Sequence, residues 1–171
     1  MADAPANDAP YRIINGVEFG DGVVVYPFTN LYGCRVGDQT RIGPFVEIQK
    51  GVTVGSLCKI QSHSFICEGV EIADEVFIGH GVLFINDKRP RATAGGALQT
   101  SEHWTPQRTA IERRAALGSG VVILGGVRIG ESATIGAGAV VTRDVPAGAT
   151  VVGNPARTLA VEKRPEIGDD V

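Results

Sequence analysis

The chain has 171 residues, 23 of them glycine, and valine (21) with isoleucine (14) outnumbers leucine (7) five to one. Because branching at Cβ restricts side-chain rotamers in helices, this composition excludes a mostly helical protein and indicates strands and tight turns. The net charge of −3 excludes the broad basic surface of a nucleic-acid-binding protein, and no apolar run approaches the roughly 20 residues of a membrane span.

Residues 1–10, MADAPANDAP, predict a short solvated N-terminal arm. They lack the basic start and the apolar stretch of a signal peptide. The three cysteines, Cys34, Cys58 and Cys67, form no disulfide or metal-binding spacing. We therefore expect a cytoplasmic protein with reduced thiols, two of which (Cys34 and Cys58) fill small interior positions.

From Val36 onward the sequence repeats every six residues. The large apolar positions of the repeat are Val36, Ile42, Ile48, Val54, Ile60, Ile66, Ile72, Ile78 and Phe84, then Ile111, Leu117, Ile123, Ile129, Ile135 and Val141. A period of six matches neither a helix nor a simple alternating strand. It indicates a coil of short strands with a bend every six residues, in which the large residue faces the interior and a following glycine permits the bend.

The repeat divides the chain into a β-helix over 11–146, an inserted loop over 85–110 and a C-terminal tail over 147–171. A loop of this length inside a regular repeat is uncommon unless it has a function. Near the N-terminus the frame places Val24 inward and Asn30 at the next inward position. Either the first coil is distorted there, or Asn30 is a hydrogen-bonded polar group in the interior.

The repeat resembles that of the hexapeptide-repeat acyltransferases. This resemblance implies an all-β fold, a left-handed parallel β-helix, assembled as a homotrimer with active sites between subunits. VVGNPAR (151–157) is similar to the closing signature of members that use coenzyme A. NLYGC (30–34) and the run from SHSFICEGV to INDKRPRAT (62–93) resemble the N-acetyltransferases of nucleotide-linked 3-amino sugars, above all those that act on a UDP-linked 2-acetamido-3-amino-glucuronate for bacterial surface polysaccharide.

The resemblance implies acetyl transfer from acetyl-CoA to the amine of a UDP-linked sugar, with no metal. Alternatives remain: an acetyltransferase for another small acceptor (a free sugar, serine or an antibiotic), or a non-catalytic β-helical scaffold. The loop and the VVGNPAR tail argue against a scaffold, which needs neither. A zinc carbonic anhydrase needs three convergent histidines, and the spacing of His63, His80 and His103 resembles no such pattern.

Three residues are the catalytic candidates. The resemblance implies that Asn86, in FIND before the loop, contacts the acceptor amine, although Asn86 and Asp87 could simply form a turn. His63 and His80 are 17 residues apart, so we expect them on neighbouring coils near one edge, not in vertical register. Either could take the amine proton, or the departing thiolate could take it. Backbone N–H groups near Gly79 and Gly81 are candidate donors to the oxyanion.

Binding candidates surround these residues. Glu68 could hold a histidine or the amine, and Asp87 lies beside Asn86. The resemblance places the nucleotide of the sugar near the N-terminal coils, with the following candidates: Asn30, Tyr32 and Arg35. Coenzyme A is expected along the C-terminal coils, where guanidinium groups suit its phosphates; the candidates there are Gly118, Gly136, Arg128, Arg143 and Arg157.

Overall fold

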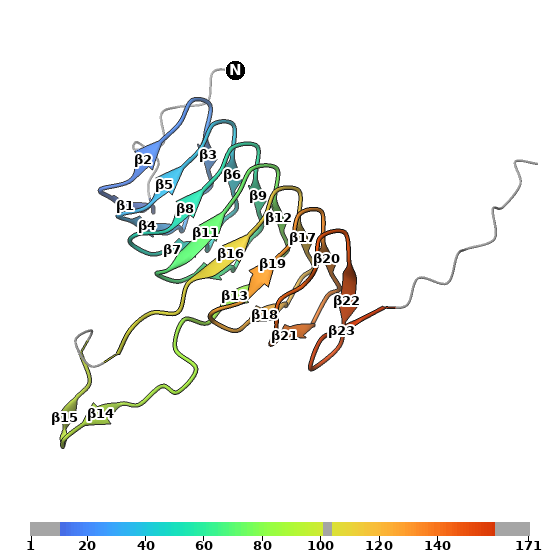
Figure 1. The fold of residues 1–171 in the computed structure, drawn as a ribbon. Coiled ribbons are helices and arrows are strands. Elements are labelled where there is room, and N and C mark those ends of the chain that lie inside the picture. Colours follow the sequence, from blue (N-terminus) through green and yellow to red (C-terminus); the bar gives the residue numbers. More distant parts are fainter. Residues whose placement is uncertain (1–10, 101–103, 160–171) are drawn as a thin grey trace, which may run out of the picture.

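The computed structural model describes residues 11–100 and 104–159 (Figure 1). The predicted arm at 1–10, His103 and the tail from residue 160 onward lie outside the described residues. The described chain winds into a parallel β-helix whose short strands form three sheets. The prediction of an all-β, left-handed β-helix is confirmed.

Each coil contributes its strands to the three sheets in turn (Figure 1). Sheet A contains β1 (Ile13–Asn15), β4 (Asn30–Tyr32), β7 (Glu47–Ile48), β10 (Phe65–Ile66), β13 (Leu83–Phe84), β18 (Val122–Ile123) and β21 (Val140–Val141). Sheet B contains β2 (Glu18–Phe19), β5 (Arg35–Val36), β8 (Thr53–Val54), β11 (Val70–Ile72), β16 (Thr109–Ile111) and β19 (Arg128–Ile129). Sheet C contains β3 (Val24–Val25), β6 (Arg41–Ile42), β9 (Lys59–Ile60), β12 (Phe77–Ile78), β17 (Ala116–Leu117), β20 (Thr134–Ile135), β22 (Thr150–Val152) and β23 (Arg157–Thr158).

All fifteen large positions of the repeat are buried, as predicted. Equivalent positions stack in register, so that Ile60 is the strand partner of both Ile42 and Ile78. Full burial of one such side chain contributes about 1.5–3 kcal/mol, and stacking repeats that contribution in every coil. Cys34 and Cys58 occupy small interior positions, each 1 % exposed, as predicted.

The first coils differ from the prediction because one turn is shorter. Val25, not Val24, is buried, and Leu31 fills the next interior position. Leu31 and Val36 are five positions apart, whereas successive interior positions of the later repeat are six apart, so the interior frame shifts by one residue. Asn30 therefore precedes the buried Leu31 on the outer side of β4 and is not an interior polar group.

The glycines that follow the large residues do not act as bends, which corrects the sequence interpretation. At Gly118 an added Cβ would lie 2.5 Å from the backbone nitrogen of Ala137 on the next coil. Side-chain-bearing residues instead take the left-handed backbone at other positions, such as Gln39 (φ 55°) and Leu57 (φ 60°). The glycines that follow the large residues, such as Gly118, therefore serve to let neighbouring coils stack closely.

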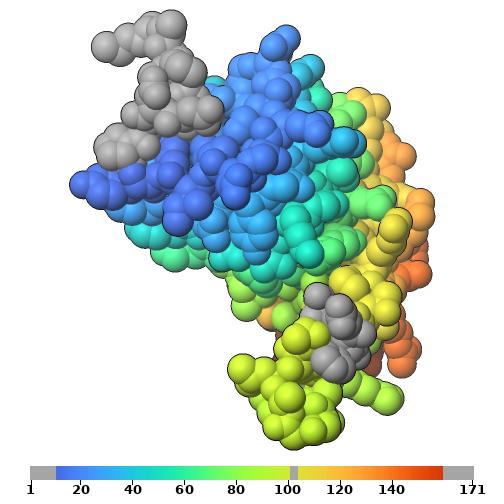
Figure 2. Space-filling view, turned by 90° about the vertical axis from the view of Figure 1, so that its left-hand side faces the viewer, coloured from blue at the N-terminus to red at the C-terminus, as the bar shows by residue number. Residues whose placement is uncertain are grey.

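Two segments depart from the regular coil. The loop leaves after β13 and carries a hairpin of β14 (Thr93–Ala94) and β15 (Ala97–Leu98) that projects far from the β-helix (Figures 1 and 2). At the C-terminal end the β-helix does not stop at residue 146, because β22 pairs in parallel with β20 and buries Val151. β23 then folds back antiparallel to β22.

The outward columns of the three sheets differ in chemistry. On sheet A the column is Ile13, Asn30, Glu47, Phe65, Leu83, Val122 and Val140. On sheet B it is Glu18, Arg35, Thr53, Glu71, Ala110 and Arg128. Sheet A is thus mostly apolar outside, whereas sheet B mixes acids and bases. In the described ranges the chain forms no helix, and hence none that could cross a bilayer.

Candidate active site

Asn86 lies where the chain leaves sheet A, at an edge that we call the loop corner, between sheets A and B. Its Nδ2 donates a hydrogen bond to the backbone oxygen of Glu68 at 3.0 Å. Its backbone oxygen accepts a hydrogen bond from the backbone nitrogen of Gln107, at 3.0 Å, where the loop returns. No donor bonds to Asn86 Oδ1 in the described part of the chain, so this oxygen is free to accept a hydrogen bond from an amine.

Glu68 lies one coil before Asn86 at the same corner. Its Oε2 is 3.6 Å from Lys50 Nζ, and its backbone nitrogen donates to Gln49 Oε1 at 3.2 Å. The residue borders a hollow of about 330 Å³, lined by Gly51, Glu68, Gly69, Glu71, Thr105, Pro106 and Arg108. The sequence candidates Glu68 and Asn86 are therefore neighbours, and Glu68 lines a hollow that the returning loop partly encloses.

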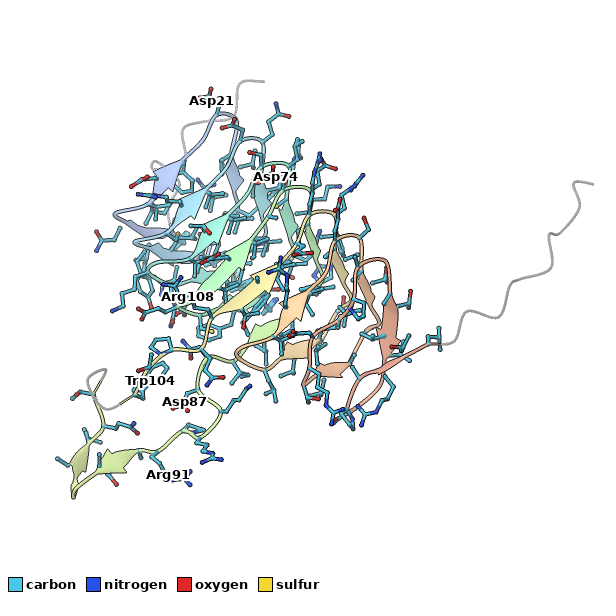
Figure 3. The ribbon with its side chains drawn as sticks, in the orientation of Figure 1. Asp21, Asp74, Asp87, Arg91, Trp104 and Arg108 are labelled. Carbon is cyan, nitrogen blue, oxygen red and sulfur yellow. The ribbon has the colours of Figure 1, made fainter. Side chains whose placement is uncertain are left out.

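Asp87 orders the start of the loop. Its Oδ1 accepts a hydrogen bond from the backbone nitrogen of Arg89 at 2.7 Å, which closes a turn. Figure 3 shows Asp87, Arg91 and Trp104 on the two arms of the loop, below the body of the β-helix. This hydrogen bond supports the interpretation that Asp87 forms a turn, because its carboxylate accepts from the backbone of the loop.

The three nucleotide candidates divide between two faces. Tyr32 ends β4 at the loop corner, where burial and then the charge of Glu47 raise the pKa of its hydroxyl. Asn30 is on sheet A, in register with Glu47. Arg35 is on sheet B, where its Nε lies 2.8 Å from Glu18 Oε2. Arg35 is thus paired and turned away from Asn30.

His63 and His80 lie at the edge between sheets C and A, which we call the histidine corner. His80 Nδ1 is 2.9 Å from Ser62 Oγ, and the His80 backbone nitrogen donates to Ser119 Oγ at 3.2 Å. His63, one position further along its coil, stacks on Phe45 with ring centroids 4.8 Å apart. Both imidazoles are exposed, and they lie on neighbouring coils out of vertical register, as predicted.

The two corners are separated by a full face of the β-helix. His80 precedes β13 and Asn86 follows it. The histidines lie at the edge between sheets C and A and Asn86 at the edge between sheets A and B, so they do not share an edge of one chain. A site that needs both must combine corners from two chains.

The proposed oxyanion donors are already engaged. The backbone nitrogen of Gly79 donates to Leu117 O at 2.8 Å, and that of Gly81 donates to Ser62 O at 2.9 Å. These bonds belong to the regular stacking of coils. The expectation that these two N–H groups are available to an oxyanion is therefore wrong.

The coenzyme candidates are also dispersed. Arg128 is on sheet B and pairs with Glu112; Arg143 follows β21 at the loop corner; Arg157 is on β23, where its Nη1 donates to Ala156 O at 2.9 Å. Gly118 and Gly136 follow β17 and β20 and lie along the histidine corner. Of these five, the two glycines share the edge of His80.

Sequence reasoning missed Ser62 and Gln49, which orient His80 and Glu68. Ser62 is 18 residues before His80, and Gln49 is 19 before Glu68. One coil is about 18 residues long, so polar residues separated by one coil were a usable signal. A search for such pairs would have found Ser62.

The three thiols are buried in the interior of the β-helix and are not exposed at either corner. Cys34, Cys58 and Cys67 are all buried and free, and burial raises the pKa of Cys34 and of Cys67 to about 11. Thiols of this kind are protonated and unreactive near neutral pH. Within residues 11–100 and 104–159 no group of three His, Cys, Asp or Glu residues could hold a metal ion, and His103 lies outside those ranges.

Comparison with known proteins identifies the repeat. The bacterial transferase hexapeptide (six repeats) matches residues 33–68 and again residues 108–143. The matched family model thus covers the repeat on both sides of the loop. Its repeat accounts for the interior columns on both sides of the loop, and the loop corner and the histidine corner are built where that repeat turns.

Solved structures share this architecture. A hexapeptide-repeat acetyltransferase of Vibrio cholerae O1 biovar eltor, solved with acetyl coenzyme A, is 27% identical to this chain, with a TM-score of 0.62 over 77% of this chain and 72% of that one. AntD, an N-acyltransferase of Bacillus cereus solved with dTDP and coenzyme A, has 21% identity and a TM-score of 0.74 over 86% of this chain and 84% of that one.

Curated relatives match over part of their length. The bifunctional protein GlmU of Methylococcus capsulatus is 32% identical over 165 residues, which are 92% of this chain and 35% of the relative. GlmU of Polaromonas naphthalenivorans is 31% identical over 77% of this chain and 29% of the relative. This chain therefore spans about a third of the length of these relatives.

Proposed function

We propose that the protein transfers the acetyl group of acetyl-CoA to the amino group of a nucleotide-linked 3-amino sugar, with UDP as the nucleotide. The observation that carries the proposal is Asn86, whose Nδ2 donates to the backbone oxygen of Glu68, a residue that lines a hollow, while its Oδ1 has no donor within the described residues. The acetyl-CoA complex of the Vibrio cholerae neighbour supports the donor. The similarity of residues 62–93 to sugar N-acetyltransferases supports the acceptor.

The proposed active unit is a homotrimer with sites between chains. The exposed apolar column on sheet A, in which Ile13 is 65% and Leu83 40% exposed, favours packing against another copy. With sheet A at a threefold axis, the histidine corner of one chain faces the loop corner of the next. That arrangement supplies both His80 and Asn86 to each cleft.

In the proposed reaction Asn86 Oδ1 accepts a hydrogen bond from the neutral amine and orients its lone pair toward the thioester carbon. A carbon–nitrogen bond forms, the carbon–sulfur bond breaks, and the amine proton leaves. His80, held through Nδ1 by Ser62, receives this proton at Nε2, or the departing thiolate of coenzyme A takes it directly. The products are the acetamido sugar and coenzyme A.

The test is release of coenzyme A, followed with a thiol reagent, which the buried cysteines of the native protein leave undisturbed. Acceptors would be UDP- and dTDP-linked 3-amino sugars, glucosamine, serine and an aminoglycoside. We expect turnover with the UDP-linked sugar and its loss in Asn86→Ala. Binding of acetyl-CoA without turnover of any amino sugar would contradict the proposed acceptor, whereas turnover of serine or glucosamine alone would indicate the other class of acetyltransferase.

A further inference from the structure

Sheet C carries two basic side chains stacked on each other at its N-terminal end. Arg41 on β6 and Lys59 on β9 are direct partners in the parallel register, and both are exposed. The full outward column of this sheet is Val24, Arg41, Lys59, Phe77, Ala116, Thr134 and Thr150. It contains no carboxylate, and like charges placed opposite each other on neighbouring strands destabilise a sheet.

The basic side chains on sheet B, in contrast, have acidic partners. There Arg35 pairs with Glu18, and Arg128 pairs with Glu112. At the edge between sheets B and C, Arg114 pairs with Glu131. Within the described ranges, no Asp or Glu pairs with Arg41 or Lys59. Two neighbouring exposed cations without an acidic partner can attract an external anion.

The surface beside the pair is hollowed and has an aromatic wall. A hollow of about 320 Å³ is lined by Tyr26, Arg41, Gly43, Pro44, Lys59, Ile60 and Gln61. The registers place Tyr26 and Gln61 on either side of Gly43, which has no side chain. The ring of Tyr26 is 43% exposed, so a planar group can lie against it while the cations reach its charge.

We propose that Arg41, Lys59 and Tyr26 form a binding site for the diphosphate of a nucleotide, with Tyr26 against the base or ribose. A guanidinium suits two phosphate oxygens at once, and a lysine supplies a point charge beside it. The hollow adjoins the histidine corner through Pro44, which precedes the exposed Phe45 that stacks on His63. The ligand therefore lies on the N-terminal side of the proposed cleft.

In the proposed function two substrates carry a diphosphate: the UDP-linked sugar and the coenzyme A donor. The choice of these two ligands therefore rests on the proposed function. The pair lies on β6 and β9, several coils before Gly118 and Gly136, the coenzyme candidates of the histidine corner, and this separation favours the UDP-linked sugar. Calorimetric titration with UDP, coenzyme A and inorganic pyrophosphate separates the sources without any turnover. The protein is used as the intact chain, and its mass in solution is measured in parallel.

We expect Arg41→Gln and Lys59→Gln each to weaken UDP binding about tenfold, the loss typical of a charged hydrogen bond, without changing the mass in solution. Tyr26→Leu should weaken UDP but not pyrophosphate. The matched control is Arg114→Gln, which removes the same charge at the edge between sheets B and C and should leave both affinities unchanged.

Weakened coenzyme A binding with unchanged UDP binding would assign the same diphosphate site to the donor. Unchanged affinity for both ligands, or a change of mass in place of a change of affinity, would overturn the site. If UDP binding depends on Arg41 but no amino sugar is acetylated, the site stands and the proposed function fails. If amino sugars are acetylated by Arg41→Gln with unchanged KM and UDP affinity, the function stands and the site fails.

Discussion

His80 and Asn86 lie at opposite ends of the same strand, β13, with the exposed Leu83 between them on sheet A. One chain therefore presents its histidine corner on one side of that face and its loop corner on the other. In a threefold assembly built on sheet A, each corner has a different neighbour. The geometry predicts a site in which the two residues come from two chains.

Mixed assemblies test this arrangement. Coexpressed in equal amounts, His80→Ala and Asn86→Ala chains should regain about a quarter of wild-type activity, because three-quarters of randomly formed trimers are hybrids and each hybrid keeps one intact site of three. Each variant alone should be nearly inactive. The measurement is the rate of thiol release per mole of site. A mixture no more active than its parents would place both residues' functions within one chain.

The apolar column of sheet A should be needed for assembly. Leu83→Asp places a charge where the proposed interface excludes water, so we expect the trimer to dissociate and acetyl transfer to fall with it. Light scattering and activity measure the two effects. The matched control is Thr53→Asp, at an outward position on sheet B, which should keep both the trimer and its acetyl-transfer activity. Equal behaviour of the two variants would argue against sheet A as the interface.

The interior of the β-helix was predictable because equivalent positions of successive coils stack on each other, and this one rule determines which residues are buried. Ile60 is buried for the same reason as Ile42 and Ile78, so a period of six suffices. Val24 and Val25 were misassigned because a single shorter turn shifts the frame, and the sequence holds no marker for it. The same limit applies wherever the coil departs from its period.

The candidate site was less predictable because the face on which a polar residue lies depends on that frame. Asn86 and Glu68 were predicted and are neighbours at the loop corner. Arg35, chosen by resemblance, and Arg128, chosen for its charge, lie on sheet B with acidic partners. The separation of His80 from Asn86 follows from the three-sided cross-section, which a linear spacing between two residues does not express.

The buried thiols should make stability depend on pH in the alkaline range. Burial raises the pKa of Cys34 to about 11, against about 8.5 in an unfolded chain. Above the unfolded value the native state holds more protons than the unfolded state, so the free energy of unfolding falls as pH rises toward about 11. Cys34→Ala removes this contribution.

Urea unfolding of wild type and Cys34→Ala at neutral pH and at about pH 10 gives the measurement. The variant should be less stable by about 1 kcal/mol at neutral pH, since alanine fills the same interior position in other coils, as at Ala115 and Ala133. The gap should shrink or reverse at alkaline pH. A gap that is constant with pH would show that the Cys34 thiol titrates normally.

Gly118 and Gly136 share the histidine corner but differ in what a methyl group would meet. At Gly118 a Cβ would lie 2.5 Å from the Ala137 backbone nitrogen, whereas at Gly136 the nearest atom is Val152 Cγ1, at 2.7 Å. Backbone cannot yield without moving the coil, but a valine side chain can turn. Gly118→Ala should therefore lower the free energy of unfolding by about 1–3 kcal/mol, and Gly136→Ala by clearly less.

Urea unfolding measures the two losses, and titration with coenzyme A on the folded variants shows whether either glycine also contacts the ligand. Weaker coenzyme A binding by Gly136→Ala at nearly unchanged stability would support the proposed course of the coenzyme along this corner. Equal stability losses for the two variants would contradict the distinction between backbone and side-chain contact, because the C-terminal coils would then be yielding to both methyl groups alike.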